Sequence, residues 1–388
     1  MSVLYGPLSY DGPPPASGAW REGYPVGQRR FLDVGDVEVV AGVTVPDVRV
    51  AYQTWGTLNA DRSNAVYICH ALTGDSHVSG PAGPGHLTDG WWDGLVGAGA
   101  PIDTNEWFVV CANVLGGCQG TTGPASLAPD GREWGSRFPV VTVADMVEVE
   151  RRVMDHLGIG SWALMLGPSL GGMRVLEWMA AHPERVRSGL VLGTTAAVTA
   201  DQIGTHATQI AAIEADPLFR GGDYYGAAAG EGPHIGMGVA RRIAHLTYRS
   251  ESELSLRFGR DSQGDEDPMG GGRFAVESYL DHQADKLARR FDANTYIALT
   301  RAMSLFDVGD GRGGAAEVLG GFRAPLTVVG LDSDRLFPLR LQEELVAATP
   351  SAHPLHVVRS PYGHDGFLVE KDQVGTIVRD ALSAVPVA

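Results

Sequence analysis

An abrupt change of period at residues 162–180, which read WALMLGPSLGGMRVLEWMA, leaves few folds open to this chain. The apolar run predicts a buried strand that ends at Gly167, and the amphipathic spacing from Gly171 predicts a helix. One hydroxyl, that of Ser169, lies at the join among three glycines and a proline. Gly-x-Ser-x-Gly at a strand-to-helix junction is the nucleophile-elbow pattern, in which a sharp turn requires small neighbours. The sequence therefore predicts that Ser169 is a nucleophile at the N-terminus of a helix.

Strands and helices alternate on both sides of this junction. Short β-prone runs separated by turn residues predict antiparallel strands within 38–57. Thr142 or Asp145 is expected to cap the first helix. Buried strands are expected within 64–74, 106–116, 161–167 and 186–195, and helices within 141–159 and 171–183. Such alternation predicts an α/β fold with a mostly parallel sheet and flanking helices.

The pattern changes after Thr195 and becomes almost entirely helical. Helices are expected at 206–219, 237–250, 274–291 and 293–306, and the strand signal returns at 324–338. We therefore expect an N-terminal arm rich in Pro and Gly over 1–30, an α/β core over 31–195 and 321–388, and an inserted helical lid over 196–320.

The charge and the side-chain inventory exclude several classes of protein. The chain has 46 acidic and 30 basic residues, a net charge of −16 that disfavours nucleic acid, so an anionic cofactor would need a local basic pocket. Three cysteines without paired spacing fit a reducing cytosol. No signal-peptide pattern and no run near the ~20 apolar residues of a membrane span is present, so we expect a cytoplasmic protein without a membrane partner. His70, His77 and His86 lack compact ligand spacing, and no metal is expected.

A serine hydroxyl becomes nucleophilic when a histidine takes its proton and an acid orients that histidine. In the elbow fold the chain order is Ser, then Asp or Glu, then His. His364 lies in a Gly-containing loop after the last expected strand, and Asp332 and Asp334 follow the strand before it. The residues alone favour Asp334 over Asp332 only slightly, because the apolar LFP sequence after it could anchor the loop.

An acyl-serine mechanism also needs donors for the developing oxyanion. The backbone N–H of Leu170 is the first, at the start of the helix. The loop HALTG at 70–74 is expected to supply the second from Leu72, with His70 as a packing and hydrogen-bonding residue of that loop.

Several longer strings occur in an order that resembles the homoserine O-acetyltransferases, from about residue 30 to 370. They are AYQTWGTLNADRSNAVYICHALTGDSH, NVLGGCQGTTGPASLAPDGREWG, FPVVTVADMV, GPSLGGMRVLEW, ARRIAHLTY, RFDANTYIALTRAM and YGHDGFL. The resemblance implies an α/β-hydrolase fold with a helical lid and a cytoplasmic homodimer. It also implies L-homoserine as substrate, acetyl-CoA as co-substrate and no permanently bound cofactor.

Carried onto this sequence, the resemblance makes Ser169 the nucleophile, Asp334 the acid and His364 the base. It implies that Arg241 and Asp365 contact homoserine, with Tyr248 as a further contact, since arginine can grip a carboxylate and aspartate can pair an ammonium. From the residues alone, Arg241 would be a solvated lid charge, and Asp365 would as readily be a loop cap.

The elbow departs from the resembled family at three positions. Pro168 and Leu170 stand where Gly and Met are frequent, and neither change removes the turn or the backbone N–H of residue 170. Arg174 stands where Gln is frequent, and its charge, one turn into the helix, is expected to alter the acyl pocket.

These observations predict a ping-pong acetyl transfer from acetyl-CoA to L-homoserine that gives O-acetyl-L-homoserine for methionine biosynthesis. The alternatives are a succinyl donor, serine as acceptor, an esterase with the same triad, and a catalytically silent binding protein on the same fold.

Overall fold

The computed structural model describes residues 12–385. Part of the expected arm, residues 1–11, lies outside the described residues. The remainder of the arm packs against the protein: the N–H of Gly18 donates to Phe291 O, and the N–H of Trp20 donates to Cys118 O. The side chains of Ala19 and Trp20 are buried, so this segment forms part of the packed structure.

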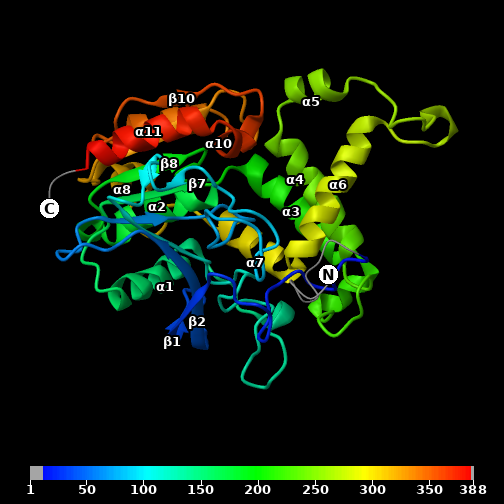
Figure 1. Cartoon of the computed structure of the whole chain (residues 1–388), viewed down its shortest axis with the longest axis horizontal. Helices are drawn as coiled ribbons and strands as arrows, with labels where there is room; N and C mark the ends of the chain where they lie inside the picture. Colours follow the sequence, from blue (N-terminus) through cyan, green and yellow to red (C-terminus); the bar gives the residue numbers. More distant parts are fainter. Residues whose placement is uncertain (1–11, 386–388) are drawn as a thin grey trace.

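The centre of the molecule is an eight-stranded sheet with the order β1-β2-β6-β3-β7-β8-β9-β10 (Figure 1). Its first three strands in this order pair antiparallel, and all the other neighbours pair parallel. The strands are β1 (Arg30–Glu38), β2 (Thr44–Trp55), β3 (Ala65–Ile68), β6 (Phe108–Ala112), β7 (Leu164–Pro168), β8 (Gly189–Leu192), β9 (Leu326–Leu331) and β10 (His356–Val358). The mostly parallel sheet is confirmed.

Two features of the strand prediction differ from the structure. The first strand, β1, begins at Arg30, so the sheet starts before residue 38. A separate two-stranded sheet, formed by β4 (Val96–Gly97) and β5 (Ile102–Asp103), was not predicted, because two-residue strands are too short to carry a period.

Helices cover both faces of the sheet. Along β7, Met165 packs in the cluster that includes α1 (Val143–His156) and α2 (Leu170–Ala181), whereas Leu164 and Leu166 pack in the cluster that includes α11 (Lys371–Ser383). This alternation explains why the central strands are apolar throughout: a strand between two helical layers buries both of its faces. Two further helices, α9 (Arg340–Ala348) and α10 (Gly366–Val369), follow β9 and β10. The three cysteines are buried and free.

Both residues expected to cap the helix at 141–159 take part in its cap. Thr142 is the N-cap of α1, and its hydroxyl accepts from the N–H of Asp145, while the Asp145 carboxylate accepts from the N–H of Thr142 at 2.7 Å. This capping box fixes where α1 begins.

Six helices lie between β8 and β9 in the chain. They are α3 (Ala200–Glu214), α4 (His234–Tyr248), α5 (Glu251–Phe258), α6 (Ala275–Arg290), α7 (Ala293–Ser304) and α8 (Ala315–Gly320). Figure 1 shows α3, α4, α5 and α6 gathered beside one end of the sheet, with α7 running back toward it. Among the described residues, no helix is long and apolar enough to cross a bilayer.

Candidate active site

Ser169 lies at the turn between β7 and α2 in a strained backbone conformation, with φ 55° and ψ −123°. The glycines around it are required by close packing. A Cβ at Gly171 would overlap the carbonyl oxygen of Cys69, at the end of β3, and a Cβ at Gly167 would lie 2.5 Å from the carbonyl carbon of Gly171. A Cβ at Gly172 would lie 2.7 Å from the Thr194 side chain. The sharp turn therefore holds Ser169 close to the end of β3, with its N–H bonded to Leu192 O at 2.9 Å.

Asp334 and His364 form a buried pair beside the serine. Nδ1 of His364 lies 2.6 Å from Oδ2 of Asp334, and Oδ1 of Asp334 accepts the N–H groups of Leu336 (2.8 Å) and Phe337 (2.9 Å). Asp332 instead accepts the N–H of Ser360 at 3.0 Å. Of the two aspartates left open by the residues, the structure places Asp334 against the histidine.

The electrostatics of this pair favour a basic imidazole. Burial alone lowers the pKa of His364, but the charge and hydrogen bond of Asp334 outweigh burial and raise that pKa above its ordinary value. Two backbone donors hold the Asp334 carboxylate in place. The arrangement can therefore remove a proton from a hydroxyl and keep the resulting imidazolium stable.

Ser169 and His364 both line a cavity of about 130 Å³. The cavity is also lined by Leu72, Arg241, Tyr248 and Asp365. Of the predicted site residues, only Asp334 and Leu170 do not line it. Ala71, Thr73 and Gly74 of the expected loop at 70–74 also line it, and the lining residues that the sequence did not indicate are Trp91, Arg290, Phe367 and Leu368.

The loop after β3 is held by hydrogen bonds from both sides. The N–H of Gly74 and the ring Nδ1 of His70 both lie within hydrogen-bond distance of Ala71 O, at 2.9 and 2.8 Å. Nε2 of His70 accepts the N–H of Val114 at 3.2 Å, which leaves the ring proton on Nδ1. Burial, with the charge of Arg174, lowers the pKa of His70 to about 3, so this ring is neutral.

This arrangement defines two possible oxyanion donors. The Ala71 carbonyl belongs to the same peptide unit as the N–H of Leu72, so the hydrogen bonds to that carbonyl fix the direction of this N–H. Leu170 is the first residue of α2, and its N–H has no acceptor within the helix. His70 is a hydrogen-bonding residue of this loop.

Arg241, Tyr248 and Asp365 bring opposite charges into the same cavity. The guanidinium of Arg241 lies 5.4 Å from the centre of the Tyr248 ring, and its buried Nε and Nη1 atoms have no partner among the described residues. Burial raises the pKa of Asp365 above its ordinary value, against the charges of Arg241, His364 and Arg249. A ligand carboxylate would satisfy Arg241, and a ligand ammonium would join Nη1 of Arg249, which lies 3.5 Å from Oδ2 of Asp365.

Arg174 does not lie where the sequence suggested. Its side chain is fully buried and does not line the cavity. Helical side chains tilt toward the N-terminus of their helix, which carries Arg174 beneath the elbow to Glu150 on α1, with 2.9 Å between Nε and Oε1. The charge of Arg174 therefore does not enter the catalytic cavity.

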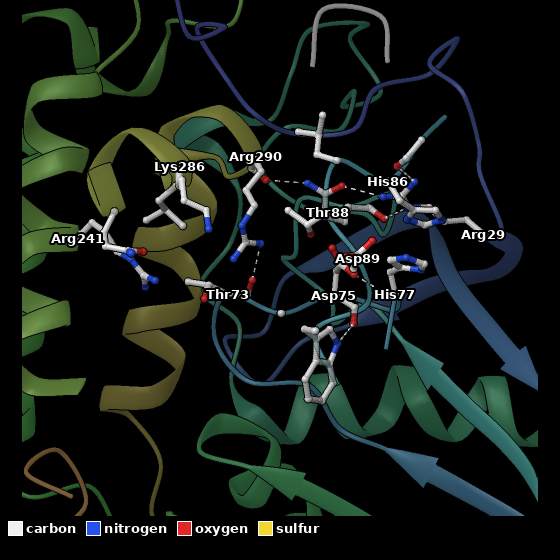
Figure 2. Close-up of a pocket in the computed structure, with 17 residues that line it drawn as sticks. Arg29, Thr73, Asp75, His77, His86, Thr88, Asp89, Arg241, Lys286 and Arg290 are labelled. Atoms are coloured by element: carbon white, nitrogen blue, oxygen red, sulfur yellow. Dashed lines mark hydrogen bonds between the residues drawn. The ribbon is translucent and has the colours of Figure 1, made fainter. Parts of the chain in front are cut away.

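A second cavity, of about 180 Å³, adjoins the first and shares Thr73, Gly74, Trp91, Arg241 and Arg290 with it. Figure 2 shows Lys286 and Arg290 on one helix, α6, with Arg241 on a different helix beside them. Asp75, Asp89 and the stacked rings of His77 and His86, 3.8 Å apart, lie at the other side. No local signal could have linked Lys286 and Arg290 to Ser169, because they lie more than a hundred residues away in the sequence.

Comparisons with known proteins agree with this geometry. A family described as alpha/beta hydrolase fold matches residues 64–371. A homoserine O-acetyltransferase of Thermobifida fusca is 55% identical over 379 residues, which cover 97% of this chain and 100% of that protein.

Two solved structures have nearly the same fold. The homoserine O-acetyltransferase of Bacillus anthracis superposes with a TM-score of 0.84 at 26% identity, over 93% of this chain and 99% of that one. Esterase E22 superposes with a TM-score of 0.82 at 24% identity, over 91% and 99% of the two chains, a likeness of fold alone.

Proposed function

Because this chain belongs to the homoserine O-acetyltransferase family of α/β-hydrolase-fold enzymes, we propose that it makes O-acetyl-L-homoserine through an acetyl-serine intermediate, with acetyl-CoA as donor. Acetyl transfer to homoserine is the reaction that its relatives are named for, and it serves methionine biosynthesis. The observation that carries the two-step mechanism is one cavity lined by Ser169, His364, Arg241 and Asp365.

In the first step, His364 takes the proton of Ser169 as Oγ attacks the thioester carbonyl. The N–H groups of Leu72 and Leu170 stabilise the negative charge on the carbonyl oxygen. The C–S bond then breaks, and the proton on His364 passes to the departing CoA thiolate. Asp334 keeps the imidazole in the tautomer that this transfer needs.

In the second step, homoserine binds with its carboxylate on Arg241 and its ammonium on Asp365, with Tyr248 beside them. His364 removes the proton of the homoserine hydroxyl, whose oxygen attacks the acetyl-serine. The ester bond to Ser169 breaks, the serine regains the proton, and O-acetyl-L-homoserine leaves. Holding both ends of homoserine aims its hydroxyl at the ester and favours it over water.

The cations of the second cavity support a phosphorylated donor. The protein carries −16 overall, so an anion needs a local positive site. Lys286 is one of only two lysines in the chain, and burial with the charges of Arg290 and Arg241 lowers its pKa. A bound phosphate would relieve this repulsion, and the adjoining cavity leads from it to Ser169. No permanently bound cofactor is part of the proposal.

The helices between β8 and β9 are the proposed lid that limits the access of water to the acetyl-serine. Truncating them should raise the ratio of hydrolysis to transfer, and an unchanged ratio would argue against this role.

We further propose that the enzyme works in the cytoplasm as a homodimer. Size-exclusion chromatography with light scattering tests the dimer.

The alternative reaction is ester hydrolysis, since a structure with the same fold is an esterase. The deciding experiment follows thiol release from acetyl-CoA and from succinyl-CoA, with and without L-homoserine or L-serine. Thiol release that requires acetyl-CoA and homoserine supports the proposal. Release that does not depend on either amino acid indicates a thioesterase, and faster reaction with succinyl-CoA or with serine changes the donor or the acceptor.

The covalent step has its own test. Ser169→Ala should abolish turnover, and mass spectrometry of the wild-type enzyme mixed with acetyl-CoA alone should show an acetyl group on Ser169. An active Ser169→Ala enzyme would contradict the acetyl-serine intermediate.

A further inference from the structure

A buried ion pair lies directly beneath the candidate site. Arg174 on α2 and Glu150 on α1 are each about 99% buried or more, with 2.9 Å between Nε and Oε1. The other carboxylate oxygen of Glu150 accepts the indole N–H of Trp178 at 2.8 Å. Neither charged residue lines the catalytic cavity.

A buried ion pair of this kind is weak evidence of a contribution to stability. Removing two charges from water costs several kcal/mol per ion, and replacement of a buried pair by apolar residues is often neutral or stabilising. The buried charge therefore calls for some other contribution, and another contact of the guanidinium suggests one.

The guanidinium also holds the backbone at the start of the oxyanion loop. Nη1 of Arg174 donates to the carbonyl oxygen of His70 at 3.0 Å. That carbonyl lies one peptide unit before the Ala71–Leu72 peptide, which carries the proposed donor N–H. On its other side, the loop is held by the bond between His70 Nδ1 and Ala71 O and by the turn from Ala71 to Gly74.

The two oxyanion donors come from different elements, and Arg174 connects them. Leu170 starts α2, whereas Leu72 follows β3. Gly171 packs against Cys69 O with no room for a Cβ, so the two elements already touch at one point. Arg174 adds a second contact, one turn further along α2, between this helix and the loop after β3. A single contact would let the loop rotate relative to α2, whereas two contacts fix its orientation.

We propose that Arg174, held by Glu150, is a positioning residue that keeps the N–H groups of Leu72 and Leu170 aimed at one oxyanion. This inference depends on one part of the proposed function, the formation of an acyl group on Ser169, and not on the identity of the donor or the acceptor. An arginine suits this task because its planar group makes two fixed contacts at once, which the single ammonium of lysine does not reproduce.

The test compares Arg174→Lys, Arg174→Gln and the charge-neutral double variant Glu150→Gln/Arg174→Gln with a matched control. Glu177→Gln provides that control, because Glu177 lies on the same helix and pairs with Arg312, away from the oxyanion loop. We expect the Arg174 variants to lower the rate of Ser169 acetylation about tenfold or more with little change in the KM for homoserine, since small misplacements of catalytic groups are costly. Glu177→Gln should leave the acetylation rate within about twofold.

A second readout separates positioning from general damage. A trifluoromethyl ketone forms a tetrahedral oxyanion on Ser169, so its affinity should fall by the same factor as the acetylation rate. Unchanged acetylation and ketone affinity in folded Arg174→Lys would overturn the inference, as would an equal loss in Glu177→Gln. If Arg174→Gln does not fold, Arg174→Lys, which keeps the charge, decides the question.

Acetylation is measured as the burst from p-nitrophenyl acetate, which requires neither CoA nor homoserine. A wild-type enzyme that shows the burst but does not acetylate homoserine would contradict the proposed function and still test Arg174.

Discussion

His364 and Asp334 form a buried hydrogen-bonded pair, in which Asp334 orients the imidazole and two backbone N–H groups orient Asp334. The carboxylate lies 2.6 Å from Nδ1 of His364, and backbone donors at residues 336 and 337 fix its other oxygen. The imidazole therefore has one tautomer available, with Nε2 left for the reacting hydroxyl.

Loss of the Asp334 charge should change both the rate and its pH dependence. A protonated His364 cannot act as a base, so kcat/KM should rise with pH through a pKa above the ordinary histidine value. Asp334→Asn should lower activity on the order of 10⁴-fold, as in other serine triads, and move the acid limb to lower pH, because burial then acts without the opposing charge. A pH profile of kcat/KM measures both effects.

The neighbouring aspartate provides the control. Asp332 accepts a backbone N–H from Ser360 and does not contact His364, so Asp332→Asn should keep the position of the acid limb. An unchanged limb in Asp334→Asn would contradict the assignment of that residue.

The contact of Arg241 with homoserine should act on the acceptor half of the reaction. Arg241→Ala is expected to raise the KM for homoserine about 10- to 100-fold, the cost of a lost charge-assisted contact, with the burst from p-nitrophenyl acetate intact. Steady-state kinetics with homoserine varied gives the first quantity, and stopped-flow absorbance the second.

Arg242, the next residue of α4, pairs with Asp281 at 2.6 Å and serves as the matched control. Arg242→Ala should leave the KM for homoserine unchanged. An equal increase in the two variants would mean that the helix, and not the guanidinium of Arg241, is responsible.

Lys286 should lower the KM for a thioester donor only when that donor carries phosphates. Lys286→Ala is expected to raise the KM for acetyl-CoA about three- to tenfold, with a smaller effect at high salt. The KM for S-acetyl-N-acetylcysteamine, a thioester without phosphates, should not change.

The other lysine of the chain, Lys371, donates to Asp93 O on a different part of the surface, so Lys371→Ala controls for the loss of a charge. If Lys286→Ala raised the KM for both thioesters alike, the phosphates of CoA would have to bind elsewhere.

Two glycine-to-alanine changes should have opposite effects on stability. Gly171→Ala would place a methyl group against Cys69 O and is expected to destabilise the fold by about 1–3 kcal/mol and to disturb the elbow. Gly204 lies within α3 with open space at its Cβ position, so Gly204→Ala should stabilise the protein by about 0.5–1 kcal/mol. Urea unfolding measures both, and a stable, fully active Gly171→Ala enzyme would contradict the packing argument.

The sequence predicted the features that depend on local patterns. The turn at Ser169, the cap at Thr142 and the alternation of strands and helices all follow from the order of neighbouring residues. The choice between Asp332 and Asp334 did not, because both residues follow the same strand and only the course of the loop separates them.

Contacts between distant segments were beyond the sequence. The direction of Arg174 depends on Glu150, which faces it from another helix, and the cations of the second cavity meet only when α4 and α6 pack together. Such contacts carry no period, cap or turn residue that a linear pattern could reveal.

The adjacency of His364 and Asp365 limits how the enzyme could change its acceptor. The proposed base and the proposed ammonium partner are consecutive residues of one 3₁₀ turn, Gly363–Asp365, so a mutation that re-aims the carboxylate also rotates the imidazole. Arg241 lies on α4, a separate element, so its side chain can be replaced without changing the chain that carries the base. Engineering toward a new alcohol would therefore begin with the side chain at position 241, while the turn that carries both His364 and Asp365 is kept unchanged.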